Sequence, residues 1–458
     1  MNSQMSSAKT QPARGMRDFL PADVRKREYV IGVIKEVYER YGFEPLETPA
    51  VENIETLMGK YGEEGNQLIF KILKRGEHEK TGEADLALRY DLTVPLARVV
   101  AQYQNELPKF FKRYQIQPVW RADRPARGRF REFYQCDVDV LGSRSMVVEA
   151  EICAAASDVL TRLGFSDFTI RLNHRKILSG LLETLEVPPD KHNDALIAID
   201  KLDKIGTEGV EKELLTKGVS QLAIDSVLTI LHFVQGQSET EENDSWNQII
   251  LETLSNHLEQ YDKELEGLGE IQRILNYSST SSAGPHIKID PSLARGLSYY
   301  TGAIMEVDVP GLAGSLGGGG RYDNLVGMFL GKDIPACGFS LGLERIIVVM
   351  VERNMFPAEM VASPADVMVT IWNEDSVGES IGLATELRSK GLRVDLYPEA
   401  DKMGKQFKYA SARGIPFVAI VGDDERARGE VAIKDLKSGE QRPVKREGVA
   451  DAIRTRGA

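Results

Sequence analysis

The segment 110–142 carries six arginines among apolar and aromatic residues. Two β-like runs, Tyr114–Trp120 and Phe130–Val140, enclose an Arg-, Pro- and Gly-rich turn, which predicts a β-hairpin. Guanidinium groups at this density destabilise a folded hairpin unless an anion lies against them. Because a guanidinium binds phosphate through two parallel hydrogen bonds, the segment predicts a polyphosphate-binding surface. An edge hairpin with solvated arginines is the alternative.

The returning strand of this hairpin presents a chemically mixed face. Side chains alternate along a strand, so one face is expected to carry Arg129, Arg131, Phe133, Gln135, Asp137 and Asp139. It would offer arginines for phosphates, an aromatic ring for base stacking, an amide and carboxylates. An adenine nucleotide beside a small polar ligand with donor groups suits this set. The alternative places Phe133 in the core and leaves Asp137 or Asp139 as a solvated edge charge.

Length and composition indicate a soluble globular protein with several domains. The 458 residues suggest about two to four domains. Hydrophobic residues make up 42% and charged residues 28%, which is ordinary for such proteins. No run of about 18 apolar residues occurs, so no membrane span is expected.

Net charge and cysteine usage argue against several further classes of protein. The net charge of −12 argues against indiscriminate nucleic-acid binding, although a local basic patch can still hold a specific RNA. Cys136, Cys153 and Cys337 form no CxxC pair, and the six histidines lack metal-ligand spacing. We therefore expect neither a disulfide framework nor a metal site held by the protein. A reducing cytoplasm is the expected location.

Apolar periodicity predicts an α+β core interrupted by a helical insert. Helices are predicted at 23–41, 93–102, 145–163 and 343–353, and strands at 68–73, 86–90, 167–172, 286–290, 302–309 and 336–341. Asp23 is the expected N-cap of the first helix. Between 174 and 278 the pattern is helical and nearly free of strand signals.

A change of pattern near residue 361 predicts a separate α/β domain. Strands at 366–372, 392–397 and 416–421 alternate with helices at 375–389 and 402–413, and a strand at 430–435 and a helix near 447–456 follow. The βαβαβ order predicts a largely parallel sheet. The expected organisation is a disordered lead-in at 1–13, a core at 14–173 and 279–360, the insert at 174–278 and the last domain at 361–458.

Three further motifs bear on chemistry. Arg295 lies in an apolar and aromatic setting, where an arginine without a partner is costly. Gly317–Gly320 permits tight turns or a close approach to a ligand, but it lacks the pattern of a phosphate-binding P-loop. Arg345 opposes the dipole at the start of a predicted helix, which indicates an anion or a ring face as its partner.

Together the motifs resemble class II aminoacyl-tRNA synthetases, and within them the histidyl-tRNA synthetase family. The segment 23–49 resembles motif 1, the dimer element, while 110–142 resembles motif 2 and 336–350 resembles motif 3. The segments LRYDLTVPLAR (88–98), LARGLSYYTG and GGGGRYDNLVG resemble the histidine-specific signatures, and 404–422 is similar to the class IIa anticodon-binding domain. The resemblance covers about 14–458. It implies an antiparallel sheet with flanking helices, a helical insertion domain and a C-terminal α/β anticodon-binding domain.

The resemblance implies a two-step reaction. The carboxylate of L-histidine would attack the α-phosphate of ATP, and the histidyl group would then pass to a terminal ribose hydroxyl of tRNA(His). Arg121 is expected to hold the α-phosphate and Arg295 to stabilise the developing charge, so both are the expected catalytic residues. Arg129, Arg345 and Phe133 are expected to join Arg121 in binding ATP. Mg²⁺ would bridge the outer phosphates.

The family motifs also imply a histidine pocket. Asp91, Gln135 and Asp139 are expected to hold the α-amino group, with Thr93 as a neighbour. Arg295 is expected to face the same ligand, and Tyr300 and Tyr322 to contact the imidazole. A neutral imidazole has one donor and one acceptor nitrogen, so a selective pocket must complement both.

Some positions depart from the family pattern. A large bacterial branch has glutamate at the positions of Asp91 and Asp139, whereas aspartate is usual in the eukaryote-like branch. Asp123 stands where the motif 2 consensus has glutamate, and Ser298 where aspartate or asparagine is usual. Arg113 and Arg124 are left as candidates for structure or tRNA contact. A homodimer is implied; the alternatives are a catalytically inactive regulatory or tRNA-binding paralogue and a ligase acting on another acceptor.

Overall fold

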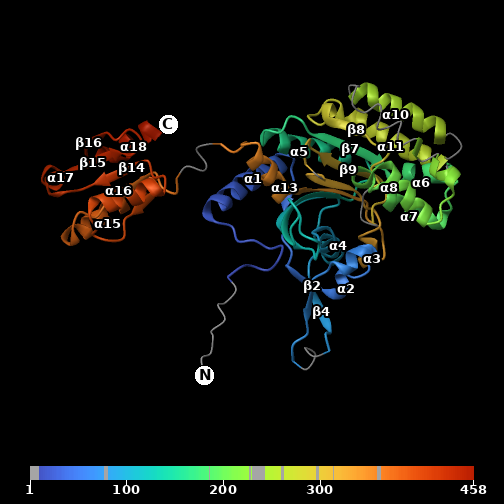
Figure 1. Cartoon of the computed structure of the whole chain (residues 1–458), viewed down its shortest axis with the longest axis horizontal. Helices are drawn as coiled ribbons and strands as arrows, with labels where there is room; N and C mark the ends of the chain where they lie inside the picture. Colours follow the sequence, from blue (N-terminus) through green and yellow to red (C-terminus); the bar gives the residue numbers. More distant parts are fainter. Residues whose placement is uncertain are drawn as a thin grey trace. The chain divides into compact units, whose positions relative to one another are not determined.

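The computed structural model describes residues 10–76, 81–184, 186–225, 228–229, 243–258, 262–294, 299–312, 314–357 and 363–457. The chain divides into two compact units, Met1–Met355 and Phe356–Ala458. Figure 1 shows a large sheet with its helices in the first unit and a smaller sheet in the second. Most of the expected disordered lead-in, residues 1–9, lies outside the described residues. Within the described part of the chain, no helix has the length and apolar character needed to cross a membrane.

The first unit opens with α1 (Pro21–Arg40), close to the predicted helix. Pro21 occupies the first turn, where its missing N–H costs nothing. The predicted N-cap was wrong: Leu20 is the N-cap, and Asp23 lies in the first turn, where its charge complements the helix dipole. The buried face consists of Val30, Ile34, Val37 and Tyr38, together with Arg27.

A mixed sheet forms the centre of the first unit. Its strand order among the described residues is β1-β5-β6-β11-β10-β9-β7-β8. The strands are β1 (Glu44–Pro45), β5 (Phe111–Trp120), β6 (Glu132–Leu141), β7 (Thr169–His174), β8 (Ile287–Ile289), β9 (Ala303–Asp308), β10 (Gly317–Arg321) and β11 (Ala336–Gly342). Pairing is antiparallel except between β1 and β5 and between β7 and β8. Strands from distant parts of the chain thereby lie side by side.

The glycine run forms a strand, not the turn or ligand-approach segment that the sequence suggested. Gly317–Gly320 lie in β10, between β9 and β11. A Cβ on Gly319 would lie 2.1 Å from the carbonyl oxygen of Gly338, and one on Gly320 would lie 2.5 Å from that of Ala303. The close approach is therefore to neighbouring strands, which leave no room for side chains.

Helices α1, α5 (Val147–Arg162) and α13 (Leu343–Glu352) cover this sheet. α1 packs against both α5 and α13, and these two contact β11 and β6. Glu344 joins the elements, because one carboxylate oxygen accepts from Arg27 at 2.7 Å and the other accepts from the backbone N–H of Tyr134 at 2.9 Å. The pair fixes the start of α13 beside β6.

A smaller sheet and α4 lie beside β5. The sheet has the order β2-β4-β3, formed by β2 (Val51–Asn53), β4 (Ala84–Leu88) and β3 (Lys71–Leu73). Two short helices, α2 (Ile54–Leu57) and α3 (Gly62–Gln67), lie between β2 and β3 in the chain. α4 (Thr93–Gln102) has the bounds that the sequence predicted.

The predicted helical region is confirmed where it is described. It contains α6 (Arg175–Thr184), α7 (His192–Ile199), α8 (Leu202–Thr216), α10 (Asn243–Leu258) and α11 (Asp262–Ser278). α10 covers the edge strand β8. Trp246 donates to the carbonyl of Ile289 at 2.8 Å, and Asn247 donates to that of Ile287 at 3.0 Å. These bonds satisfy backbone groups that an edge strand would otherwise leave open.

The second unit has its own sheet, with the order β13-β12-β14-β15-β16. The strands are β12 (Val367–Val369), β13 (Val394–Leu396), β14 (Phe417–Ile420), β15 (Glu430–Asp435) and β16 (Gln441–Lys445). The helices are α15 (Val377–Ser389), α16 (Met403–Ala412), α17 (Asp423–Arg428) and α18 (Val449–Gly457). β13, β12 and β14 are parallel, as the βαβαβ pattern predicted, whereas β15 and β16 are antiparallel. The sequence prediction had missed α17 and β16.

Candidate active site

The predicted arginine hairpin is confirmed, with strands longer than expected at one end. β5 and β6 pair antiparallel, so that Arg113 lies opposite Asp139 and Gln117 opposite Gln135. The placement of Arg129 and Arg131 on the strand face was wrong. β6 begins at Glu132, so both residues precede it: Arg129 is bridged to Ala126, and Arg131 Nε donates to the carbonyl of Asp123 at 3.0 Å. The turn contains Pro125 and Gly128, and Gly128 has a positive φ of 68°, which interrupts the extended backbone before β6.

Arg121 lies where β5 ends and is held by its neighbours. Its Nε donates to the carbonyl of Tyr90 at 3.0 Å. Its guanidinium carbon lies 4.3 Å from the centroid of the Tyr90 ring and 5.2 Å from that of Phe133. Contact with aromatic faces fixes the guanidinium while leaving its terminal nitrogens available to an anion.

Two further predicted arginines gather at the hairpin turn. Arg129 forms a two-point contact with Asp123, at 3.2 Å from Nε and 3.0 Å from Nη2. The Arg129 side chain is 52% exposed, so this pair contributes little stability and can exchange for an anion. Arg345 extends from the start of α13 and donates to the carbonyl of Ser315. A Cβ on Gly128 would lie 3.4 Å from Arg345 Cγ, which places this arginine beside the turn.

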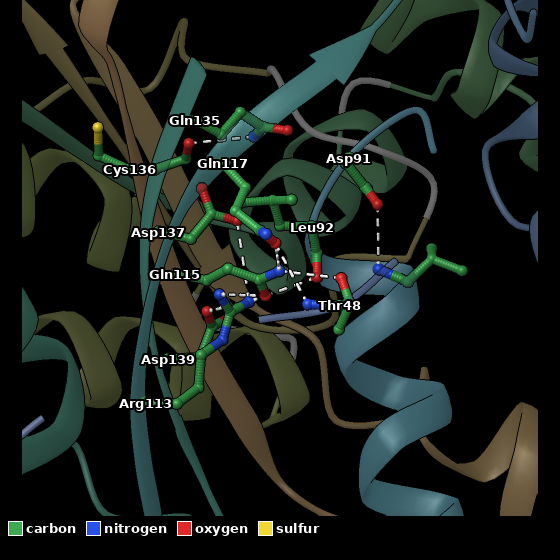
Figure 2. Close-up of polar contacts among 12 residues, drawn as sticks. Thr48, Asp91, Leu92, Arg113, Gln115, Gln117, Gln135, Cys136, Asp137 and Asp139 are labelled. Carbon is green, nitrogen blue, oxygen red and sulfur yellow. Dashed lines mark hydrogen bonds and ion pairs between the residues drawn. The ribbon is translucent and has the colours of Figure 1, made fainter. Parts of the chain in front are cut away.

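Figure 2 shows a polar network among side chains of β5 and β6. Arg113 is fully buried, with Nη2 at 2.7 Å from an Asp139 oxygen and 3.8 Å from an Asp137 oxygen. Its Nη1 donates to Gln115 Oε1 at 3.3 Å. The Gln115 amide in turn donates to Thr48 Oγ1 at 2.9 Å. Of the two roles left open for Arg113, structure or tRNA contact, its burial supports structure.

Asp91 lies just before α4, facing the same network. One of its oxygens accepts from the Tyr61 hydroxyl and from the backbone N–H of Val94, both at 3.0 Å. The Tyr299 hydroxyl approaches the other oxygen at 3.5 Å. Burial raises the pKa of Asp91 above its ordinary value, opposed by these hydrogen bonds and by Arg121. Thr93 begins α4 next to this carboxylate.

Three tyrosines line the other side of the carboxylates. The Tyr322 hydroxyl donates to Asp139. The Tyr299 ring makes edge contacts with Tyr300 and Tyr322, at centroid distances of 5.0 and 5.9 Å. Burial raises the pKa of all three tyrosines, with nearby carboxylates adding to the effect. They therefore act as neutral hydroxyl groups.

The charge balance of this pocket favours a cationic or donor-rich ligand. Asp91, Asp137 and Asp139 are buried, and the buried Arg113 forms ion pairs with Asp137 and Asp139. Burial raises the pKa of all three carboxyls, that of Asp137 to about 7. Gln135 Oε1, Asp137 Oδ1 and Asp139 Oδ2 have no hydrogen-bond partner among the described residues, although Asp139 Oδ2 lies 2.7 Å from Arg113 Nη2 and the Ser340 hydroxyl interacts with the Asp137 carboxyl. Buried acceptors are normally satisfied, so Gln135 Oε1 indicates where a donor group of a ligand belongs.

The structure brings together most of the predicted site residues. Gln135 and Asp139 lie on one face of β6 near Asp91. Three further predicted residues lie beside these carboxylates: Thr93, Tyr300 and Tyr322. Arg121 and Phe133 lie where the hairpin strands meet the turn, and Arg129 and Arg345 lie at the turn itself. Arg295 and Ser298 lie outside the described residues.

Other site residues were not assigned from the sequence. Asp137 was placed on the correct face but given no role, and its alternation with Gln135 and Asp139 was the available signal. Gln115 faces the same network, and two-residue alternation from Arg113 along β5 would have found it. No local signal marked Tyr61, because its contact with Asp91 depends on tertiary packing.

Comparison with known proteins identifies the family to which the chain belongs. The sequence profile described as histidyl-tRNA synthetase matches residues 15–346, and that of an anticodon-binding domain matches 366–456. The chain is 42% identical to histidine–tRNA ligase of Christiangramia forsetii, covering 96% of this chain and 98% of the relative. It is 44% identical to that of Porphyromonas gingivalis, covering 93% and 95%.

Solved structures agree with the sequence comparison. The crystal structure of histidyl-tRNA synthetase from Nostoc sp. PCC 7120 superposes with a TM-score of 0.81 at 32% identity, covering 98% of this chain and 99% of that one. The fold thus consists of the class II synthetase core with its large mixed sheet, followed by an anticodon-binding domain with a sheet of its own. The chain belongs to the histidyl-tRNA synthetase family.

Proposed function

We propose that this protein attaches L-histidine to tRNA(His), using ATP and forming histidyl-adenylate as an intermediate. The observation that carries the proposal is the face of β6, where buried acceptor atoms lie next to an arginine that offers its terminal nitrogens to an anion. An amino acid has an ammonium group for the acceptors and a carboxylate that reacts at a phosphate. The retained arginines disfavour an inactive paralogue.

In the first step, a carboxylate oxygen of histidine forms a bond to the α-phosphorus of ATP. The bond from that phosphorus to the bridging oxygen breaks, and pyrophosphate leaves. Arg121 would bind the α-phosphate and the reacting carboxylate, because its guanidinium is fixed by Tyr90 and Phe133. Such positioned charge stabilisation supplies most of the rate enhancement in phosphoryl chemistry. Arg295 would stabilise the developing charge from a second direction.

The hairpin turn would bind the rest of ATP. Arg129 would exchange its exposed contact with Asp123 for an outer phosphate. Arg345 reaches the same turn from α13, and Phe133 would stack on the adenine. Among the described residues, no cluster of three or more His, Cys, Asp or Glu side chains could hold a metal ion. Mg²⁺ is proposed as part of the MgATP substrate.

The buried pocket would recognise histidine. Asp91, Gln135 and Thr93 would hold the α-amino group near Arg121, while Tyr300 and Tyr322 would contact the imidazole. Asp139 was expected at the α-amino group. Its oxygens already contact the Tyr322 hydroxyl and Arg113, so it would act mainly by orienting Tyr322.

The second step would transfer the histidyl group to a terminal ribose hydroxyl of the tRNA, releasing AMP. The second unit would bind the anticodon, and the helical region 174–278 would act as an insertion domain beside the core of 14–173 and 279–360. A homodimer joined through α1 and the following strand, and a cytoplasmic location, complete the proposal.

Aminoacylation of total tRNA with each amino acid in turn tests the function directly. The proposal predicts charging with histidine alone, dependent on ATP, and recovery of the product as histidyl-tRNA(His). Charging with a different amino acid, or tight histidine binding without any charging, would refute it. The second result would instead favour a regulatory paralogue.

A further inference from the structure

Residues 15–19, the N-terminal segment, lie against the hairpin turn formed by residues 121–131. The backbone N–H of Arg131 donates to the carbonyl of Gly15 at 2.8 Å. Gly15 has a φ of 85°, and a Cβ there would lie 2.8 Å from Arg131 Cγ and 3.0 Å from Pro125 Cγ. Glycine at this position therefore permits both the backbone conformation and the close approach to the turn.

Arg131 connects the N-terminal segment to the arginines that would bind ATP. Its carbonyl accepts from the backbone N–H of Arg121 at 2.9 Å, and its Nε donates to the carbonyl of Asp123 at 3.0 Å. The Asp123 carboxylate in turn holds Arg129. A displacement of Arg131 would therefore move Arg121 and loosen the part of the turn that carries Arg129.

Arg17 provides a second contact between the N-terminal segment and the hairpin turn. Its guanidinium carbon lies 3.4 Å from the centroid of the Phe130 ring and 4.8 Å from that of Phe19. The guanidinium carbon of Arg27 lies 4.1 Å from the same Phe19 ring, and Arg27 is paired with Glu344 in the first turn of α13. The segment thereby connects the hairpin turn with the start of the helix that supplies another ATP-binding arginine.

These contacts contribute little to the stability of the whole domain. None of the described residues 10–20 is buried, and the buried hydrophobic residues of the described chain begin at Val30. A single backbone hydrogen bond and an exposed cation–π contact are each weak, and ordering the segment costs conformational entropy. The segment is therefore suited to fix the shape of the turn, whereas the core forms without it.

We propose that the N-terminal segment positions the hairpin turn for ATP, with Gly15 and Arg17 as positioning residues that act through Arg131 and Phe130. This inference rests on the proposed function, which assigns the turn to ATP. It makes the two substrates unequal. Binding of ATP depends on the segment, whereas the histidine pocket is held by buried contacts around Asp139 and does not.

The first test is histidine-dependent ATP–pyrophosphate exchange by Gly15→Ala, in which the new Cβ would push the segment away from Arg131. We expect the KM for ATP to rise about three- to tenfold, as for loss of one backbone hydrogen bond, while the KM for histidine stays within about twofold. Gly439→Ala is the matched control, because Gly439 also has a positive φ, of 78°, but a Cβ there would have no neighbour within 4 Å. An unchanged KM for ATP in Gly15→Ala, or an equal rise in both KM values, overturns the proposal.

The role of Arg17 is tested by comparing Arg17→Met with Arg17→Lys. We expect methionine to raise the KM for ATP about two- to fivefold, the factor that corresponds to one exposed cation–π contact, and lysine, which keeps the cation, to stay within about twofold of the wild type. Arg14→Met is the control, because Arg14 is exposed and contacts no other described residue through a hydrogen bond, an ion pair or a ring. If Arg17→Met and Arg14→Met have the same KM for ATP, Arg17 does not position the turn.

ATP binding measured alone separates this inference from the proposed function. In equilibrium dialysis without histidine, the Kd for ATP should rise in Gly15→Ala and in Arg17→Met by the same factors as the KM. Circular dichroism checks that each variant is folded, and if Gly15→Ala does not fold, the exposed substitution Arg17→Met decides the question. Equal Kd values in the folded variants and the wild type overturn the inference. Absence of histidine-dependent exchange in a wild-type protein that binds ATP would instead refute the proposed function.

Discussion

Gly338→Ala is expected to damage histidine binding without any change to a residue that touches the substrate. Gly338 lies on β11 opposite Asp139, and a Cβ there would lie 1.9 Å from Asp139 Oδ1. That oxygen accepts from Tyr322, and the same carboxylate is paired with Arg113. The carboxylate cannot move away without breaking one of these contacts.

The magnitude follows from those contacts. Overpacking costs about 1–3 kcal/mol, and a lost hydrogen bond to a charged group costs about 1.5–3 kcal/mol more. The free energy of unfolding should therefore fall by about 2.5–6 kcal/mol. The KM for histidine should rise at least tenfold, because Tyr322 loses its anchor, whereas the KM for ATP should change little.

Denaturant unfolding and ATP–pyrophosphate exchange measure the two effects. Gly269→Ala is the control: it lies in α11, and a Cβ there would meet only Arg273 Nη1, at 3.9 Å. Alanine should stabilise that helix by about 0.5–1 kcal/mol. If Gly338→Ala has the same free energy of unfolding and the same KM for histidine as the wild type, the Asp139 carboxylate is not confined as described.

Three more predictions concern charge and domain roles. Burial raises the pKa of Asp137 to about 7, above its value in the unfolded chain. The charges of Asp139 and Asp91 raise this pKa further, whereas Arg113 lowers it. Between the two pKa values the folded state binds this proton and the unfolded state does not, so the contribution of Asp137 to stability is present at low pH and is lost as the pH rises toward 7. The free energy of unfolding of the substrate-free protein should fall over this pH range. In Asp137→Asn this part of the pH dependence should be absent. Arg295→Ala should abolish ATP–pyrophosphate exchange while equilibrium dialysis still detects ATP binding, and robust exchange would remove its catalytic role. Deletion of 362–458 should leave exchange largely intact but impair charging of tRNA, whereas equal charging would contradict the domain assignment.

Local sequence patterns predicted much of the framework. The hairpin, α4 and the βαβαβ order follow from periodicity over a few residues, and the structure confirms them. Two-residue alternation along the returning strand also placed Gln135 and Asp139 on one face, whereas Asp91 was assigned to the site only through the family resemblance. These features depend on neighbours in the chain.

Features that depend on tertiary packing were not predictable. β10 was not recognised as a strand, because four glycines carry no strand propensity. Glycine is required there because β9 and β11 lie too close for side chains, which only the folded structure shows. Arg113 was left between structure and tRNA contact, because its burial depends on its contacts with Asp137 and Asp139 across the hairpin. Asp123 pairs with Arg129, a contact that only the geometry of the turn creates.

The most direct test of the central claim is ATP–pyrophosphate exchange measured with each amino acid, without tRNA, for the wild type and for Arg121→Ala. The account predicts exchange with histidine alone in the wild type. It predicts a loss of at least a hundredfold in Arg121→Ala, as for removal of one group that stabilises transition-state charge. Exchange with another amino acid, or full exchange by Arg121→Ala, would contradict a histidine-activating site built on this hairpin.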